Sequence, residues 1–279
     1  MTLPFVKMHG AANDFVVVDH RRPFLPEPLA PLVRRLCDRR RGVGADGVLL
    51  LEADPEWDFA MRYLNADGGP ADYCGNGARC LARFALDLGL GSDGRVRFRT
   101  GAGVQSARRG AEQGKIELRF GLVAGGEPCE AEVGGRTFRG RLIVAGVPHF
   151  VTEVPRVEDV PLPAWGVALR RHPRFGGPGA NVDFVAALAG GEVAMRTYER
   201  GVEAETLACG SGAIATAVWA AAAGAASPVR VRTAGGDLLT VSFERGTSGY
   251  DVTLTGGAEV AFRGEWPAPE SAARAEGGT

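Results

Sequence analysis

The sequence contains CGNGARC at residues 74–80 and CGSGAIA at residues 209–215. In each stretch a cysteine precedes a Gly-x-Gly turn, and a run of alanines and apolar residues at helical spacing follows. The two cysteines are 135 residues apart (209 − 74). The pair therefore predicts two similar helices, one in each half of the chain, each starting directly after a cysteine.

The offset of 135 residues recurs outside these stretches, which identifies the chain as an internal repeat. Gly44-Ala-Asp before VLLL matches Gly179-Ala-Asn before VDFV, and Phe15 matches Phe150. In each half the patterns predict several strands, then the cysteine turn with its helix, then further strands. We therefore expect an α+β fold with two pseudo-symmetric halves, each a mixed β-sheet curled into a barrel around a central helix. The active site is expected in the cleft between the halves.

The Gly-rich segment GLVAGGEP, residues 121–128, marks the expected boundary between the halves. We expect residues 1–121 to form the N-terminal half and residues 122–257 to form the C-terminal half. A strand near residues 258–263 is expected to cross back and complete the first half. Residues 264–279 are predicted to form a disordered tail.

The composition of the 279 residues excludes several kinds of protein. The formal net charge is −1 and no long block carries one sign, so no nucleic-acid or membrane surface is expected. The sequence shows no signal peptide and no bilayer span, and we expect a cytoplasmic protein that binds a small molecule. The 5 cysteines are an odd number without C-x-x-C spacing, which indicates free thiols in place of disulfides or a zinc site.

Residues 42–47, GVGADG, fit the G-x-G-x-x-G pattern of dinucleotide sites, which joins a strand to a following helix. Here the order is reversed, because LVRRLCDRR before the motif has helical character and VLLLEA after it is typical of a strand. We therefore interpret the glycines as turn residues and do not predict a nicotinamide cofactor.

The paired cysteines point to proton transfer at carbon. The N-terminus of a helix exposes N–H groups and partial positive charge, which lower the pKa of a cysteine and bind anions. One such cysteine is most simply structural. Two that face a common cleft suit a racemase or epimerase, in which one thiolate removes a proton and the other thiol returns one to the opposite face. The helix N-termini would stabilise the carboxylate as charge develops, without an electron-sink cofactor or a metal.

Polar residues in loops near the cysteines are candidate substrate contacts, with local turn formation as the alternative. Glu199 and Arg200 form an adjacent acid and base that could bind an ammonium and a carboxylate. His149 matches Asp14 in the repeat and could tune the proton affinity of a thiol, or it could be structural. The candidates are Asn13, Asp14, Asn65, Asp67, Asn76, Asn181, Glu199, Arg200 and Ser211.

Six motifs occur in one order over most of the chain: KMHGAANDFVVVD, GVGADG, YLNADG, CGNGARC, NVDFV and TYERGVEAETLACGSGA. Together they resemble diaminopimelate epimerase. The resemblance implies a cofactor-independent isomerase that interconverts LL-2,6-diaminopimelate and meso-2,6-diaminopimelate in lysine and peptidoglycan precursor biosynthesis, usually as a homodimer. It also implies that Cys74 is the usual proton donor and Cys209 the usual proton acceptor, with roles that reverse with the direction of reaction.

The resemblance extends to the substrate contacts. It implies that Gly75-Asn76 and Gly210-Ser211 hold the reacting carboxylate, and that further contacts come from Asn13, Asn65, Asn181, Glu199 and Arg200. Val147 departs from the family, because many members have an asparagine there, and Gly47 replaces a glutamine found in some. Two alternatives stay open: a cofactor-independent racemase or isomerase of the same fold that acts on another amino acid, and a redox protein with a reversible disulfide between the two thiols.

Overall fold

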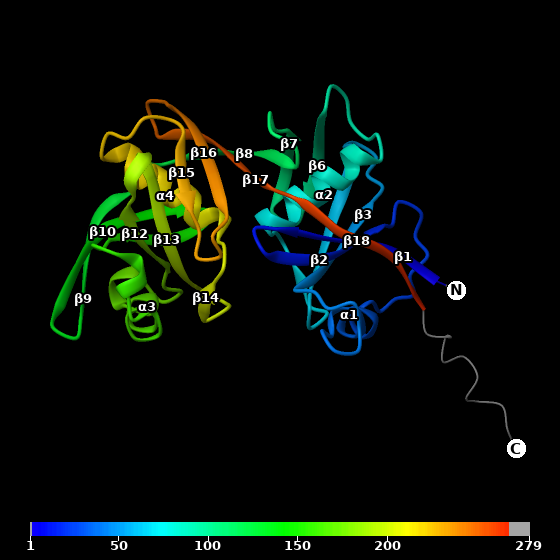
Figure 1. Cartoon of the computed structure of the whole chain (residues 1–279), viewed down its shortest axis with the longest axis horizontal. Helices are drawn as coiled ribbons and strands as arrows, with labels where there is room; N and C mark the ends of the chain where they lie inside the picture. Colours follow the sequence, from blue (N-terminus) through cyan, green and yellow to red (C-terminus); the bar gives the residue numbers. More distant parts are fainter. Residues whose placement is uncertain (1, 268–279) are drawn as a thin grey trace, which may run out of the picture.

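The computed structural model describes residues 2–267 of the chain. The two halves lie side by side, each with strands around one long helix (Figure 1). Up to β8 the elements are β1 (Thr2–Gly10), β2 (Asn13–Asp19), α1 (Ala30–Cys37), β3 (Gly47–Glu52), β4 (Phe59–Asn65), β5 (Pro70–Ala71), α2 (Gly75–Asp87), β6 (Arg95–Thr100), β7 (Gly103–Arg109) and β8 (Lys115–Val123). From β9 onward they are β9 (Glu127–Val133), β10 (Arg136–Ala145), β11 (Val147–Glu153), α3 (Leu162–Arg170), β12 (Asn181–Ala187), β13 (Glu192–Glu199), β14 (Ala204–Thr206), α4 (Gly210–Ala222), β15 (Val229–Arg232), β16 (Leu238–Arg245), β17 (Tyr250–Gly257) and β18 (Glu259–Pro267).

A helix occupies the centre of each half. α2 lies against β1 to β4 and β6 to β8, and α4 lies against β10 to β13 and β15 to β17. Each helix follows a cysteine in extended conformation and is 13 residues long. Beyond each C-terminus a glycine adopts the left-handed conformation, Gly89 (φ +77°) or Gly224 (φ +101°), which other residues rarely adopt. The predicted fold, in which a sheet curls around a central helix in each half, is confirmed.

The strands form one continuous mixed sheet. β2 pairs in parallel with β3 and β4 with β6, and the second half repeats this with β11–β12 and β13–β15. The hydrogen-bond register also repeats: Phe15 is paired with Gly47, and Phe150 with Val182, an offset of 135 in both strands (150 − 15 and 182 − 47). The sequence repeat is therefore a repeat of strand pairing.

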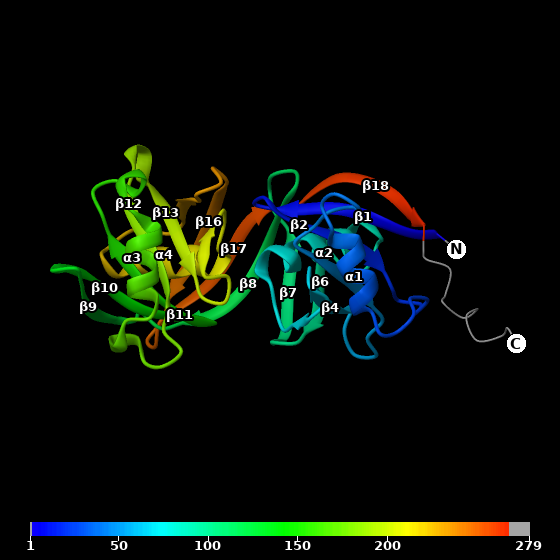
Figure 2. The same cartoon turned by 90° about the horizontal axis from the view of Figure 1, so that it is seen from below.

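Two long antiparallel strands, β8 and β17, run between the halves (Figure 2). β8 pairs with β7 in the first half and with β17 along its whole length. The expected boundary between residues 121 and 122 therefore falls inside a strand. Gly121 adopts a positive φ (+96°) next to a shift in the β8–β17 register, so this glycine marks a β-bulge in a continuous strand.

The last strand, β18, returns to the first half and pairs with β1. Residues 264–267, which the sequence places in a disordered tail, instead continue β18 up to Pro267, where Pro267 is paired with Thr2. Residues 268–279 of that predicted tail lie outside the described residues. At the equivalent place in the repeat β9 pairs with β10, so each half is closed by a strand that follows one of the two long strands.

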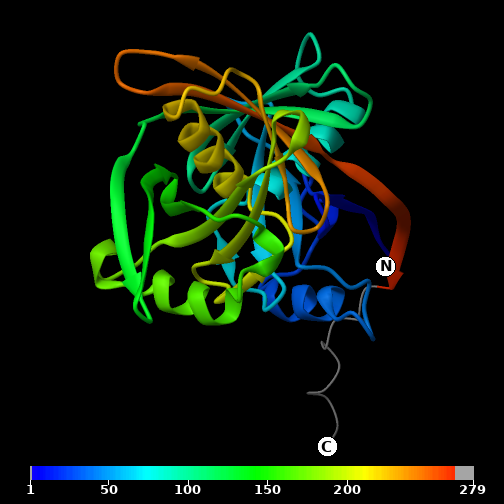
Figure 3. The ribbon, with the colours of Figure 1, turned by 60° about the vertical axis from the view of Figure 1, so that its left-hand side comes forward.

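The GVGADG motif connects the end of α1 to the start of β3, as predicted for turn glycines. Gly44 adopts a left-handed conformation (φ +76°) in this turn. α1 and α3 lie at the same end of the molecule, outside the two central helices (Figure 3). Among residues 2–267, no helix has the length and apolar character needed to cross a membrane.

Small side chains on α4 allow the surrounding strands to pack close to the helix. Ala217 is completely buried in the core cluster formed by α4 and the strands around it. We expect Ala217→Leu to lower the free energy of unfolding by about 1–3 kcal/mol in urea titrations, because the added carbons have no space. Ala222→Leu, at an exposed position of the same helix, should change it by less than about 0.5 kcal/mol. An equal loss in both variants would contradict close packing at Ala217.

Candidate active site

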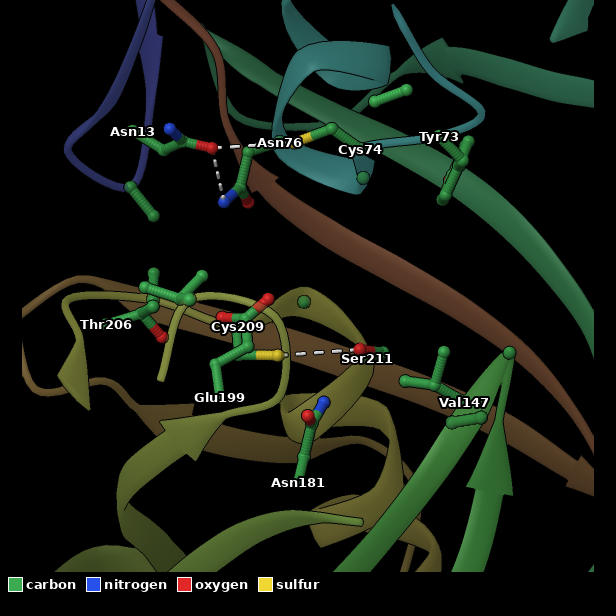
Figure 4. A pocket seen from close by; sticks show the side chains of 18 of the residues that line it. Asn13, Tyr73, Cys74, Asn76, Val147, Asn181, Glu199, Thr206, Cys209 and Ser211 are labelled. Atoms are coloured by element: carbon green, nitrogen blue, oxygen red, sulfur yellow. Dashed lines mark hydrogen bonds between the residues drawn. The ribbon is translucent and has the colours of Figure 1, made fainter. Parts of the chain in front are cut away.

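A cavity of about 990 Å³ lies between the halves, and the N-termini of α2 and α4 meet it from opposite sides (Figure 4). Cys74 and Cys209 both line it. His149 lies behind the wall formed by Ser211. The structure also places on this cavity the substrate contacts that the family resemblance implies: Asn13, Asn65, Gly75, Asn76, Asn181, Glu199, Arg200, Gly210 and Ser211. The candidates Asp14 and Asp67 do not line it, because Asp14 is bonded to Lys7 and Arg39 and Asp67 accepts the Gly69 N–H in its own turn.

The two glycines of each cysteine turn have different roles. Gly75 and Gly210, directly after the cysteines, line the cavity. A β-carbon at Gly212 would lie 2.6 Å from Oδ1 of Asp183, too close for any side chain. At Gly77 a β-carbon would lie 3.1 Å from Cδ2 of Leu49, a tight contact within the core. The second glycine therefore lets the helix pack closely, and the first leaves backbone N–H groups open to the cavity.

Amide groups surround the Cys74 thiol. Its Sγ donates to Oδ1 of Asn13 at 3.4 Å, and Nδ2 of Asn76 donates to the same oxygen at 3.3 Å. Burial raises the pKa of Cys74, whereas the N–H groups of Gly77 and Asn76 and the charge of Arg79 act in the opposite direction. The negative charge of Glu199 across the cavity adds to the effect of burial.

A hydroxyl and an imidazole lie behind the Cys209 thiol. Sγ of Cys209 accepts from the Gly212 N–H at 3.4 Å and lies 3.4 Å from Oγ of Ser211. That hydroxyl lies 3.0 Å from Nε2 of His149, and Nδ1 of His149 lies 2.7 Å from Oδ2 of Asp183. Burial raises the pKa of Cys209 well above its usual value, and the carboxylates of Glu199 and Asp183 add to this.

The hydrogen-bond partners of His149 define its tautomer. Asp183 can only accept, so Nδ1 of His149 carries the proton. Oδ1 of Asn181 accepts the Arg200 N–H at 2.7 Å, which leaves Nδ2 of Asn181 facing Nε2 of His149 at 3.3 Å. Since Nδ2 can only donate, Nε2 of this fully buried ring is an unprotonated acceptor.

The prediction that the helix N-termini lower the pKa of both cysteines is wrong for this cavity. Each thiol receives the expected backbone N–H groups, but the loss of hydration outweighs them and both pKa values rise. Burial also raises the pKa of Glu199. These groups are therefore held closer to their neutral forms than they would be in water.

Two charged residues next to the site are absent from the candidates that the sequence suggests. Arg79, on α2, is fully buried behind the Cys74 turn, and Asp183, on β12, is fully buried behind His149. Both interrupt runs of small or apolar residues, ARCLA at 78–82 and VDFV at 182–185, which is the signal that could have identified them. Within residues 2–267, no three His, Cys, Asp or Glu side chains are grouped as a metal site would require.

The family model of diaminopimelate epimerase matches residues 5–123 and 141–260, which include both cysteine turns. The chain belongs to the diaminopimelate epimerase family. It is 40% identical to the diaminopimelate epimerase of Aquifex aeolicus over 273 residues, covering 94% of this chain and 97% of that one. It is 39% identical to the diaminopimelate epimerase of Aromatoleum aromaticum, covering 95% and 99%. Membership of this family makes the chain an isomerase.

Solved structures of low sequence identity share the fold of this family member. The PhzF-family phenazine biosynthesis protein of Bacillus anthracis superposes with a TM-score of 0.70 at 13% identity, covering 95% of this chain and 99% of that one. A hydroxyproline epimerase from Agrobacterium vitis, with bound trans-4-hydroxy-L-proline, gives a TM-score of 0.67 at 19% identity, covering 95% and 92%. At these identities the likeness supports the fold alone.

The raised thiol pKa values predict how the cysteines react with iodoacetamide, which attacks only the thiolate. In the native protein the alkylation rates of Cys74 and Cys209 should keep rising above pH 9, because a raised pKa keeps each thiol protonated to higher pH. In urea both rates should level off near pH 9 or below. Peptide mapping by mass spectrometry would follow each cysteine separately. Native profiles that level off below pH 9 would show that the helix N-termini outweigh burial.

Proposed function

We propose that this protein interconverts LL-2,6-diaminopimelate and meso-2,6-diaminopimelate by a two-base mechanism. The observation that carries the proposal is the placement of two thiols on opposite sides of one cavity, each at the N-terminus of a central helix (Figure 4). Identity of 40% to a relative named diaminopimelate epimerase, over 94% of this chain, supports the choice of substrate.

In the proposed reaction Cys209, as thiolate, removes the α-proton, and Cys74, as thiol, gives its proton to the opposite face of the same carbon. The C–H bond that breaks and the one that forms lie on opposite faces, so the centre inverts. In the reverse direction the two residues exchange roles. The hydrogen bonds support this assignment, since Cys74 donates to Asn13 and Cys209 accepts from the Gly212 N–H.

His149 is proposed to help form the Cys209 thiolate. Its Nε2 is an acceptor, and Ser211 lies between it and Cys209. The proton of Cys209 can therefore pass to Ser211 while the hydroxyl proton of Ser211 passes to Nε2. Asp183, bound to Nδ1, would stabilise the resulting imidazolium.

The reacting carboxylate is proposed to bind between the two helix N-termini. Backbone N–H groups of Gly75, Asn76, Gly210 and Ser211 begin α2 and α4 and lie on the cavity. The carboxylate gains negative charge as the α-proton leaves, and donors aimed at that charge lower the barrier. One such donor contributes roughly a hundredfold to a thousandfold in rate.

The remaining cavity residues are proposed to recognise the distal amino-acid end of the substrate. Asn65 and the pair Glu199-Arg200 offer an amide, an acid and a base. An ammonium group beside Glu199 would restore the ionised carboxylate that burial disfavours. Asn181 acts indirectly, because its amide is bonded to Arg200 and His149.

Val147 favours a second candidate function, a cofactor-independent racemase or isomerase of another amino acid. It lines the cavity with an apolar side chain where the family resemblance implies an amide. Incubation in heavy water with a panel of amino acids would decide between them, since the true substrate should acquire α-deuterium fastest. The redox alternative, a reversible disulfide between the two thiols, would be excluded by full epimerase activity of the reduced protein and its loss on oxidation.

Two further properties follow from the family resemblance and belong to the same proposal. We propose that the protein acts as a homodimer and is located in the cytoplasm. Sedimentation equilibrium of the purified protein would test the first, and fractionation of the source cells the second.

Replacement of either thiol tests the mechanism. Cys74→Ala and Cys209→Ala should each lower the epimerisation rate by more than about a thousandfold, since both the acid and the base are required. The assay is deuterium incorporation into LL-diaminopimelate in heavy water, without added cofactor or metal. Cys129→Ala, in a separate core cluster of the second half, should keep near-normal turnover. Near-normal turnover in either active-site variant would rule out the two-base mechanism.

Ser211→Ala tests the link between Cys209 and His149. The Ser211 hydroxyl lowers the pKa of Cys209, so its loss should raise that pKa and move the acid limb of kcat/KM to higher pH. We expect kcat to fall by about 10-fold to 100-fold. Ser242→Ala, on β16 away from the cavity, is the matched control. A pH profile that is unchanged by Ser211→Ala would contradict the proposed proton path.

A further inference from the structure

Arg79 is a buried cation whose hydrogen-bond partners are all neutral. It lies on the second turn of α2 and is completely shielded from solvent. The guanidinium donates to Oδ1 of Asn76 at 2.8 Å, to the carbonyl of Gly257 at 3.3 Å and to the carbonyl of Gly75 at 3.4 Å. A buried charge without an ionic partner is costly, so its presence requires an explanation.

The fold leaves space for this guanidinium by omitting side chains around it. A β-carbon at Gly256, on β17, would lie 2.9 Å from Nε of Arg79. At Gly10, the end of β1, it would lie 3.2 Å from Nη2, and at Gly210, the start of α4, 4.0 Å from Nη1. Arg79 therefore lies where both long helices, β1 and β17 come together, behind both cysteine turns.

The internal repeat shows that the helix does not need a charge at this position. The residue 135 positions after Arg79 is Ile214, on the same turn of α4. Ile214 is 1% exposed and packs in the core of its own half. The equivalent position of the other central helix thus accepts an apolar side chain even where it borders the cavity, and helix packing alone does not account for arginine at residue 79.

Four ionisable groups act on Arg79, and two of them, Cys74 and Tyr73, line the cavity. The four are the thiols of Cys80 and Cys74, the hydroxyl of Tyr73 and the carboxylate of Asp237. Asp237, the one carboxylate among them, is not close enough to form an ion pair with Arg79 in the described part of the chain. The positive charge of Arg79 is thus available to anions that form between the two cysteine turns.

We propose that Arg79 is a positioning residue that supplies the fixed positive charge of the active site and balances the charge of a thiolate and of the substrate carboxylate. This inference rests on the proposed two-thiol function. Because Arg79 is already buried and fixed, it needs no reorganisation when negative charge develops during proton transfer. Arg79 does not line the cavity, and a guanidinium is not readily deprotonated, so it does not act as a competing proton donor.

Arg79 acts on Cys74 through a chain of amides as well. A guanidinium can only donate, so the atom of Asn76 that faces it must be Oδ1, and Nδ2 of Asn76 then donates to Asn13. Nδ2 of Asn13 donates to the carboxylate of Asp46 at 2.6 Å, which fixes the other end. The oxygen of Asn13 is thereby held toward Cys74, where it accepts the S–H proton.

Arg79→Met and Arg79→Lys separate the charge from packing. Methionine removes the charge but leaves an apolar side chain like that of Ile214, so the protein should fold with unchanged or higher resistance to urea. We expect kcat with LL-diaminopimelate to fall at least about a hundredfold. Loss of the charge should also move the alkylation profile of Cys74 to higher pH, with labelling about tenfold slower at pH 8. Arg79→Lys keeps the charge, so the alkylation rate of Cys74 at pH 8 should stay within about threefold of the rate in the native protein.

Arg83→Met is the matched control, because Arg83 lies one turn further along α2 and donates to the carbonyl of Ala258. It should leave both kcat and the Cys74 profile unchanged. The proposal is overturned if Arg79→Met keeps kcat within threefold, or loses activity with an unchanged Cys74 profile. It is also overturned if Arg79→Lys shifts the alkylation profile of Cys74 as far as Arg79→Met does. If the Arg79→Met protein does not fold, any shift of that profile in the Arg79→Lys protein overturns it. The alkylation profile needs no substrate, so it tests Arg79 even if diaminopimelate is not the substrate.

Discussion

Two helix N-termini face one cavity, and this arrangement determines what the rest of the structure has to provide. The exposed N–H groups that begin α2 and α4 carry partial positive charge, and like charges at this separation repel each other. β8 and β17, paired along their length, run through both halves and hold the two ends in place. The cavity is therefore bordered on both sides by backbone N–H groups, which favours the binding of a carboxylate between them.

Much of this fold is predictable from sequence because the repeat contains each local sequence pattern twice, at the same place in each half. Apolar spacing after Cys74 and Cys209 predicts α2 and α4, and the offset of 135 residues fixes which strands correspond. The boundary at residues 121 and 122 was not predictable in the same way. A glycine that permits a β-bulge and one that ends a domain have the same local signature, and only the pairing of β8 with β17 distinguishes them.

The candidate site shows the same division between local and long-range information. Most of its polar residues follow turns and strand ends, where short motifs place them, and those named as substrate contacts line the cavity. The pKa values of the thiols depend instead on burial, which arises from the packing of both halves and outweighs the local effect of the helix N-terminus. Arg79 and Asp183 contribute through contacts across more than one element, so spacing along the chain does not reveal their partners.

The chemistry of the two thiols differs at positions where the repeat is broken. Cys74 has amide neighbours, Asn13 and Asn76, whereas Cys209 has a serine and a histidine that can carry a proton. The backbone repeat places the two thiols on opposite sides of one cavity, as the proposed inversion of a carbon between them requires. Side chains that break the repeat give Cys74 an acceptor for its S–H proton and connect Cys209 to His149 through Ser211, which is the path proposed for its proton. In the proposed mechanism, symmetry of the backbone with asymmetry of the side chains is therefore what would allow a single duplicated fold to supply both an acid and a base.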